Sequence, residues 1–118
     1  MFSLTIMLYL FAMMNIQNLA ALREHAATAV PMLKLLSNED RLLLLCSMIE
    51  CERSVGDLET MTGISQPTLS QQLGILRKSE VVSTRRDGKF IYYRLADERA
   101  LQLMQTIHAL YCPAPTSN

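Results

Sequence analysis

The sequence predicts a mainly α-helical fold with one small β-hairpin, and three observations support this prediction. Apolar residues recur at the three- and four-residue spacing of helices through most of the chain. Two short alternating segments flank Asp87-Gly88, a pair that strongly indicates a hairpin turn. The chain has 118 residues, and half of them are hydrophobic. We therefore expect one domain with a small core, of a size that often completes its burial by dimerising.

We divide the chain into an apolar extension (residues 1–14), a domain (residues 15–113) and a short tail (residues 114–118). The extension, MFSLTIMLYLFAMM, has no charged side chain. We favour an upstream start codon, with Met13 or Met14 as the natural first residue. The alternatives are an extension that packs on a dimer and a membrane anchor.

The membrane interpretations of this extension have little support. A helix of this length spans about 21 Å, less than the roughly 30 Å hydrocarbon core of a bilayer. A secretory signal peptide would also need a basic first segment and a small-residue cleavage site. We therefore expect no membrane partner and a cytoplasmic location.

Two helices are predicted in the first half of the domain. The first, Asn15 to Leu36, has apolar residues at helical spacing, and Pro31 is expected to kink or interrupt it. Ser37 or Asn38 can accept hydrogen bonds from the free N–H groups that begin the next helix. That helix, Glu39 to about Glu50, is apolar on more than one side. We therefore expect it to be the central core helix.

Two shorter helices follow, joined by a tight turn. The first runs from about Ser54 to Met61 and ends at Gly63, because glycine favours the left-handed conformation that follows many helices. Ser65 is expected to cap the second helix, with Pro67 in its first turn, where no intrahelical N–H is lost. The buried face of this second helix is formed by Leu69, Leu73 and Leu76.

A hairpin and a last helix complete the domain. Residues 81–85 and 90–95 alternate as two strands, with Asp87-Gly88 between them. The last helix, Asp97 to about Tyr111, has a broad apolar face and is ended by prolines at 113 and 115.

The formal net charge is zero, but the charges are unevenly distributed along the chain. Residues 38–60 hold six acidic side chains and two basic ones: Glu39, Asp40, Glu50, Glu52, Asp57 and Glu59, against Arg41 and Arg53. Residues 66–94 hold six basic side chains and two acidic ones: Arg77, Lys78, Arg85, Arg86, Lys89 and Arg94, against Glu80 and Asp87. The basic block therefore coincides with the polar helix and the hairpin.

This order of elements is typical of a winged helix-turn-helix that binds double-stranded DNA. The second helix of such a motif fits the major groove with its N-terminal residues at the base edges. Side chains that both donate and accept suit base reading, and we predict this role for Gln66, Thr68, Ser70 and Gln71. The hairpin would be a wing that contacts phosphate or the minor groove through Arg85, Arg86 and Lys89. Each part alone is an ordinary solvated surface, and their order and short spacing make the combination specific.

Three segments resemble the arsenic-repressor-type (ArsR/SmtB) winged-helix family of bacterial repressors. They are LKLLSNEDRLLLLCSM, SVGDLETMTGISQPTLSQQLGILRKSEVVSTRRDGKFIYYRL and the terminal LYC. Within the family, the chain is most similar to the biofilm-growth-associated, sulfide-responsive (persulfide-sensing) repressors and the haemolysin-type regulators. The resemblance implies a palindromic operator, release by a ligand or by redox chemistry, and a homodimer held by the first and last helices. The predicted interface residues are Leu19, Leu22, Leu101, Met104, Ile107 and Tyr111.

The segment that carries metal ligands in some relatives lacks them here. Metal-sensing relatives have Cys-Val-Cys-Asp-Leu where this chain has Ser54-Val55-Gly56-Asp57-Leu58, so both thiols are absent. We therefore expect no metal and no cofactor. A metal-responsive repressor that uses His108 and Cys112 remains the alternative, although we favour His108 as a dimer-interface side chain.

Cys46 and Cys112 match, by position, the two cysteines of the sulfide-responsive relatives. The resemblance implies that reactive sulfur species or an oxidant links them and releases the operator. We expect Cys112, at a helix end, to be attacked first, because burial in an apolar helix should slow Cys46. Cys51 is interpreted as a small hydrophobic residue.

A function of another class remains as an alternative. A membrane-associated interaction module without a DNA role would use the apolar extension as its anchor. No nucleophile–base set, phosphate-binding loop or metal motif is present, so we expect no enzymatic activity.

Overall fold

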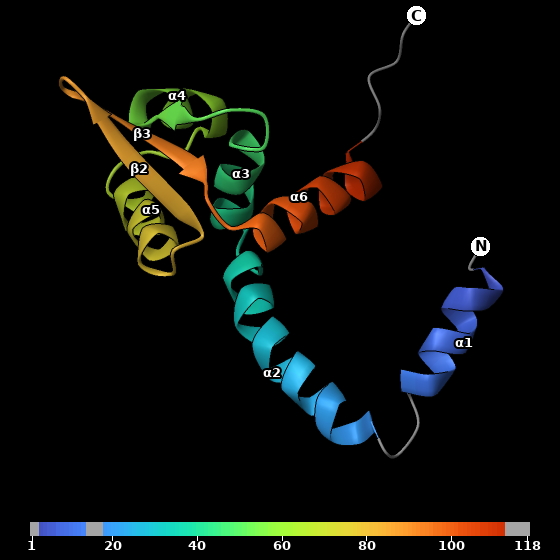
Figure 1. Cartoon of the computed structure of the whole chain (residues 1–118). Coiled ribbons are helices and arrows are strands. Elements are labelled where there is room, and N and C mark those ends of the chain that lie inside the picture. Colours follow the sequence, from blue (N-terminus) through green and yellow to red (C-terminus); the bar gives the residue numbers. More distant parts are fainter. Residues whose placement is uncertain (1–2, 14–17, 113–118) are drawn as a thin grey trace, which may run out of the picture. The chain divides into compact units, whose positions relative to one another are not determined.

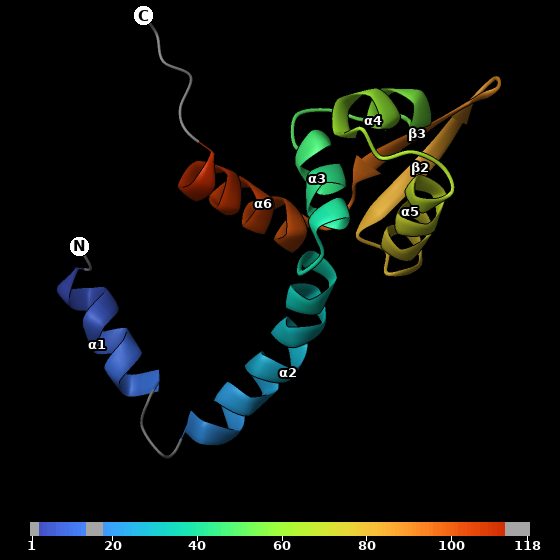
Figure 2. The same cartoon turned by 180° about the vertical axis from the view of Figure 1, so that it is seen from behind.

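The computed structural model describes residues 3–13 and 18–112, which form six helices and a three-stranded sheet (Figures 1 and 2). The chain divides into two compact units, residues 1–34 and 35–118. The predicted helix start at Asn15 and the tail 114–118 lie outside the described residues, as does the predicted domain end at residue 113.

The first unit contains α1 (Leu4–Met13) and most of α2 (Leu19–Leu36). α1 has no charged residue, and its apolar side chains, including Phe11 at 79% exposure, face outward. α2 continues through Pro31, so the expected interruption is absent. The carbonyl that loses its partner to the proline belongs to Ala27, an exposed residue at which solvent can replace the bond. Among the residues described, no helix combines the length and the apolar character needed to cross a bilayer.

α3 (Glu39–Ser47) is the central core helix, as predicted. Asn38 caps it, because its Oδ1 accepts a hydrogen bond of 3.0 Å from the backbone N–H of Arg41. Leu44 and Leu45 have no exposed surface. The helix ends three residues before the predicted Glu50, and the chain then turns outward to form the first strand.

α4 (Val55–Thr62) and α5 (Thr68–Lys78) form the helix-turn-helix. A reciprocal capping box starts α4: Ser54 Oγ accepts from the Asp57 N–H at 3.1 Å, and the Asp57 carboxylate accepts from the Ser54 N–H at 3.0 Å. Gly63 ends α4 in the left-handed conformation, with φ of 74°.

The prediction that Ser65 caps α5 is wrong, because the helix begins three residues later, at Thr68. A residue that precedes proline is disfavoured in the helical region, so Gln66 stands outside the helix. The Gln66 side chain takes over part of the cap: its Oε1 accepts a 3.2 Å hydrogen bond from the Ser70 N–H. At the other end, Glu80 has a positive φ of 65° and the Val81 N–H donates to the Leu76 carbonyl at 3.2 Å.

The sheet contains one strand more than the predicted hairpin. Its strands are β1 (Arg53–Ser54), β2 (Val82–Asp87) and β3 (Phe90–Leu95), antiparallel in the order β1-β3-β2. β1 has only two residues, too few to show an alternating pattern. β2 extends to Asp87, so the two-residue turn is Gly88-Lys89 rather than Asp87-Gly88, and Gly88 has the positive φ that it needs, at 63°.

α6 (Glu98–Tyr111) starts at the N-cap Asp97, whose Oδ1 accepts from the N–H groups of Arg99 and Ala100 at 2.8 and 3.1 Å. Its first half closes the core, because Ala100 and Met104 are fully buried. The buried apolar side chains of the second unit are Leu36, Leu44, Leu45, Met48, Leu58, Ile64, Leu69, Leu73, Leu76, Val81, Val82, Tyr93, Ala100 and Met104.

Two glycines give a matched test of this fold. At neither Gly63 nor Gly74 would an added Cβ meet an atom within 4 Å, but only Gly63 has a positive φ. We expect Gly63→Ala to lower the free energy of unfolding by about 1–2 kcal/mol through backbone strain. Gly74→Ala, inside α5, should raise it by about 0.5–1 kcal/mol. Urea denaturation at equal protein concentration measures both, and shifts in the same direction would contradict the assignment.

Candidate functional site

The start of α5 presents the predicted base-reading residues on one surface. Gln66, Ser70 and Gln71 are exposed, and Thr68 is half-buried. Gln66 and Ser70 are brought into contact, because Gln66 Oε1 also accepts from Ser70 Oγ at 2.6 Å. This bond orients the amide of Gln66 and leaves its NH₂ group able to donate to acceptors on a base edge.

Arg41 connects α5 to the start of the second unit, a role that the sequence did not predict. Its Nε donates to the Leu35 carbonyl at 2.6 Å, and its Nη1 donates to Gln72 Oε1 at 3.2 Å. Gln72 therefore packs against the domain and does not belong to the exposed polar surface. The link fixes α5 relative to the junction that leads from α2 into α3.

The wing carries two exposed cations near its turn. Arg86 at the end of β2 is exposed and, among the residues described, forms no ion pair. Lys89 in the turn is also exposed, with its Nζ 5.7 Å from the centre of the Phe90 ring. Both side chains are available for phosphate contacts.

Arg85, which was also predicted to contact DNA, is bound within the domain instead. Its Nε donates to the two carboxylate oxygens of Glu52 at 3.0 and 2.8 Å, and its Nη2 also donates to Glu52 in an ion pair. Its guanidinium carbon lies 4.5 Å from the centre of the Tyr92 ring. The hydrogen bonds between them lower the pKa of Glu52 and raise that of Arg85.

The three cysteines are free thiols in three different environments. Cys46 in α3 is half-buried, whereas Cys112, which ends α6, and Cys51, in the loop after α3, are exposed. The exposure of Cys51 does not fit its interpretation as a hydrophobic core residue. Burial raises the pKa of the Cys46 thiol, and the charge of Cys112 raises it further. Cys46 lies on α3 and Cys112 caps the end of α6, and these two helices contact each other.

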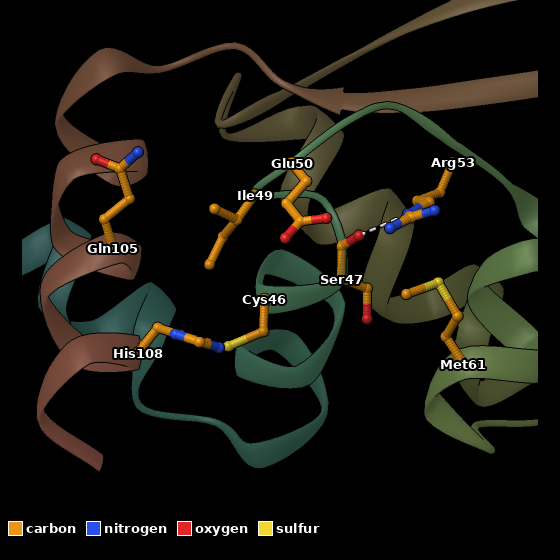
Figure 3. A pocket seen from close by; sticks show the side chains of 8 residues that line it. All are labelled: Cys46, Ser47, Ile49, Glu50, Arg53, Met61, Gln105 and His108. Atoms are coloured by element: carbon orange, nitrogen blue, oxygen red, sulfur yellow. Dashed lines mark hydrogen bonds between the residues drawn. The ribbon is translucent and has the colours of Figure 1, made fainter. Parts of the chain in front are cut away.

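Cys46 opens onto a cavity of about 350 Å³ between α3, α4 and α6 (Figure 3). Glu50, Arg53 and His108 also line this cavity, and the imidazole of His108 points toward Cys46 in Figure 3. Arg53 is held at the rim by a 2.9 Å hydrogen bond from its Nε to the Ser47 carbonyl. Small molecules can reach the half-buried thiol through this opening. Among the described residues, no group of three or more His, Cys, Asp or Glu side chains could hold a metal ion.

The predicted dimer residues differ in their exposure. On α6, Tyr111 is 80% exposed, and Leu101 and Ile107 are half-buried. Met104, which was predicted at the dimer interface, has no exposed surface and belongs instead to the core of its own domain. Leu110, which was not predicted, is 72% exposed and extends the apolar surface at the end of the helix. On α2, Leu19 is exposed and Leu22 is half-buried.

The comparisons with known proteins agree on one family. The protein-family model described as "Bacterial regulatory protein, arsR family" matches residues 38–84. The chain is 45% identical to the biofilm growth-associated repressor of Agrobacterium fabrum over 100 residues, which cover 85% of each chain. It is 37% identical to the transcriptional activator HlyU of Vibrio cholerae, over 82% of this chain and 90% of the relative.

Two solved structures extend this similarity to the fold. The transcriptional repressor BigR from Xylella fastidiosa has a TM-score of 0.75 at 45% identity, covering 80% of this chain and 97% of that chain. Reduced HlyU from Vibrio cholerae has a TM-score of 0.77 at 36% identity, covering 80% of this chain and all (100%) of that chain. The predicted resemblance and the predicted winged helix-turn-helix are thus confirmed. The chain belongs to the arsR family of bacterial regulatory proteins, and it is a DNA-binding transcriptional repressor of the type of the biofilm growth-associated repressors, not an enzyme.

Proposed function

We propose that this repressor binds a palindromic operator as a homodimer and releases it when Cys46 and Cys112 become linked. The observation that carries the DNA-binding part is the exposed polar start of α5, with the free cations of the wing in the same domain. We also propose that the protein acts in the cytoplasm, where a bacterial regulator meets DNA.

Base reading and phosphate binding fall to different side chains. Base reading falls to amides and hydroxyls near the N-terminus of α5, the part of a recognition helix that meets base edges. Thr68, Ser70 and Gln71 lie in the first turn of the helix, and Gln66 lies just before it. Arg86 and Lys89 offer positive charges, which bind phosphate in any sequence. Arg85 is omitted from the proposed contacts because Glu52 binds it.

We expect Gln71→Ala to weaken operator binding by about 1–3 kcal/mol and to change binding to random duplex much less, because it removes a base contact. Arg86→Ala should weaken binding to both DNAs and reduce the salt dependence by about one unit of slope. Fluorescence anisotropy with operator, random duplex and a single half-site measures these effects. If Gln71→Ala lost as much affinity for random duplex as for the operator, Gln71 would have no role in base reading.

Dimer formation would bury the apolar side chains that each unit leaves exposed. Leu110 and Tyr111 on α6, and Leu19 and Leu33 on α2, are between 48% and 80% exposed. Exposed apolar residues that gather at the end of one helix favour an interface over a solvated surface. A two-fold symmetric pair would present two copies of α5 to two half-sites of a palindrome.

We expect Ile107→Asp to produce monomers, because it places an unpaired charge in the proposed interface. Gln102→Asp is the matched control: it adds the same charge to the same helix at an exposed position, about 140° around the helix from Ile107. Sedimentation velocity distinguishes the two variants. An Ile107→Asp variant that stays dimeric would place the interface elsewhere.

The proposed thiol switch uses the unequal exposure of its two cysteines. The exposed Cys112 thiolate attacks the outer sulfur of a persulfide R–S–S–H, which forms a Cys112 persulfide and releases R–S⁻. The Cys46 thiolate then attacks the Cys112 sulfur, which forms the disulfide and releases HS⁻. An oxidant would give the same link through a sulfenic acid and loss of water. The raised pKa of Cys46 fits the slower, second step.

A link between Cys46 and Cys112 would join the core helix α3 to α6. α3 also contacts α4 and α5, so a strain imposed on it reaches the helix-turn-helix. Operator affinity depends on the spacing of the two recognition helices in a dimer. We therefore propose that the link weakens DNA binding by changing this spacing.

We expect the reduced protein to bind its operator tightly and the persulfide-treated protein to bind at least tenfold more weakly. Cys46→Ser and Cys112→Ser should each remain bound after treatment, and Cys51→Ser should respond like the wild type. Mass spectrometry of the treated proteins identifies the linked residues. Release of DNA by the treated double variant Cys46→Ser/Cys112→Ser would contradict the switch.

A further inference from the structure

We infer that Glu52 is an internal counter-ion that withholds Arg85 from DNA phosphate and thereby limits binding to non-operator DNA. This inference rests on the proposed DNA binding and concerns how many phosphate contacts the wing makes on any DNA sequence. Its consequence is that only one of the two adjacent wing arginines, Arg86, acts on DNA.

The Glu52–Arg85 contact uses two of the three guanidinium nitrogens, Nε and Nη2. Nε lies 3.0 and 2.8 Å from the two carboxylate oxygens, and Nη2 donates to the same carboxylate. The Tyr92 ring supports the opposite side, with its centre 4.5 Å from Cζ. Glu52 and Arg85 also form an ion pair through Nη2. The arginine is thus held by a forked pair and an aromatic ring, a more defined geometry than a lone surface ion pair.

The sheet directs Arg85 and Arg86 to opposite faces. Side chains alternate along a strand, and Arg85 stands opposite Tyr92 on β3 while Arg86 stands opposite Ile91. The strand order β1-β3-β2 lets Arg85 reach over Tyr92 on β3 toward β1, and Glu52 immediately precedes β1. Arg86 projects from the other face, where no acidic side chain pairs with it among the described residues.

The charges around the pair keep it ionised. The Arg85 hydrogen bond is the largest cause of the lowered pKa of Glu52, and the more distant charge of Arg94 lowers it further. The carboxylate is therefore negative at neutral pH. Asp87 is a second anion that favours the charged form of Arg85.

The effect of an internal counter-ion is measured most directly on random duplex. Non-specific binding depends almost entirely on phosphate contacts, whereas operator binding also has base contacts. Each phosphate that a cation neutralises adds about 0.9 to the slope of log affinity against log salt. By binding Arg85, Glu52 removes one such contact from every sequence equally.

The experiment measures the salt dependence of binding to random duplex by the intact protein. Arg85→Gln should have the slope of the wild type, because Glu52 already neutralises that side chain. The slope of log affinity against log salt should be steeper by about one unit for Glu52→Gln, because this substitution frees Arg85. The double variant Glu52→Gln/Arg85→Gln should return to the wild-type slope. Arg86→Gln should be shallower by about one unit.

Glu50→Gln is the matched control for charge alone. Glu50 is exposed, lies in the same loop and forms no ion pair among the residues described, so its removal changes the net charge without freeing an arginine. A slope for Glu50→Gln as steep as that for Glu52→Gln would overturn the inference. So would an Arg85→Gln slope below that of the wild type, since Arg85 would then contact DNA despite Glu52.

Folding and the proposed function are separated by two further readings. Circular dichroism melting establishes whether each variant is folded. If Glu52→Gln does not fold, Arg85→Gln alone still tests the inference, because its salt slope must equal that of the wild type. A wild-type chain whose duplex binding did not depend on salt would overturn the proposed function and this inference together. A normal wild-type slope with a shallower Arg85→Gln slope overturns only the inference.

Discussion

The burial of α3 is the constraint on which the rest of the domain depends. Leu44 and Leu45 are completely enclosed, and the helix contacts α4, α5 and α6. The recognition helix, the first helix of the motif and the C-terminal helix are therefore all positioned against one element. Cys46 is the next residue along this helix, so a covalent change there acts at the centre of the domain rather than at its edge. This location fits the thiol switch that we propose for Cys46.

Much of the fold could be predicted, because its main elements have strong local signals. The leucine spacing on α5, the cap at Asn38 and the left-handed Gly63 each follow from periodicity or from backbone preference, and the structure contains all three. The exposed start of α5 was predictable for the same reason: once the buried face of a helix is known, the opposite face is known. The wing followed from the alternating strands and the turn between them, whereas the pairing of Cys46 with Cys112 came from the family resemblance alone and stays a prediction.

The remaining features depend on contacts between residues that are distant in the sequence. β1 exists only because β3 lies beside it, and two residues cannot show a period of two. Met104 was predicted at the dimer interface because helical spacing shows which residues share a face, but not how much of that face the core of the same domain covers. Arg85 was assigned to DNA because adjacent basic residues look equivalent. Strand alternation places the two arginines on opposite faces of the sheet. Glu52, which lies 33 positions earlier in the sequence, binds Arg85.

The division of α5 into a leucine face and a polar face has an evolutionary consequence. The three enclosed leucines that attach this helix share no position with Gln66, Ser70 or Gln71. Substitutions at Gln71 can accumulate with little penalty to folding, because surface changes away from caps usually alter stability by less than about 0.5 kcal/mol. A substitution at Gln66 also loses the hydrogen bonds that it accepts from Ser70. Duplicated copies of such a gene could therefore acquire new target sequences while the scaffold and its thiols stay the same.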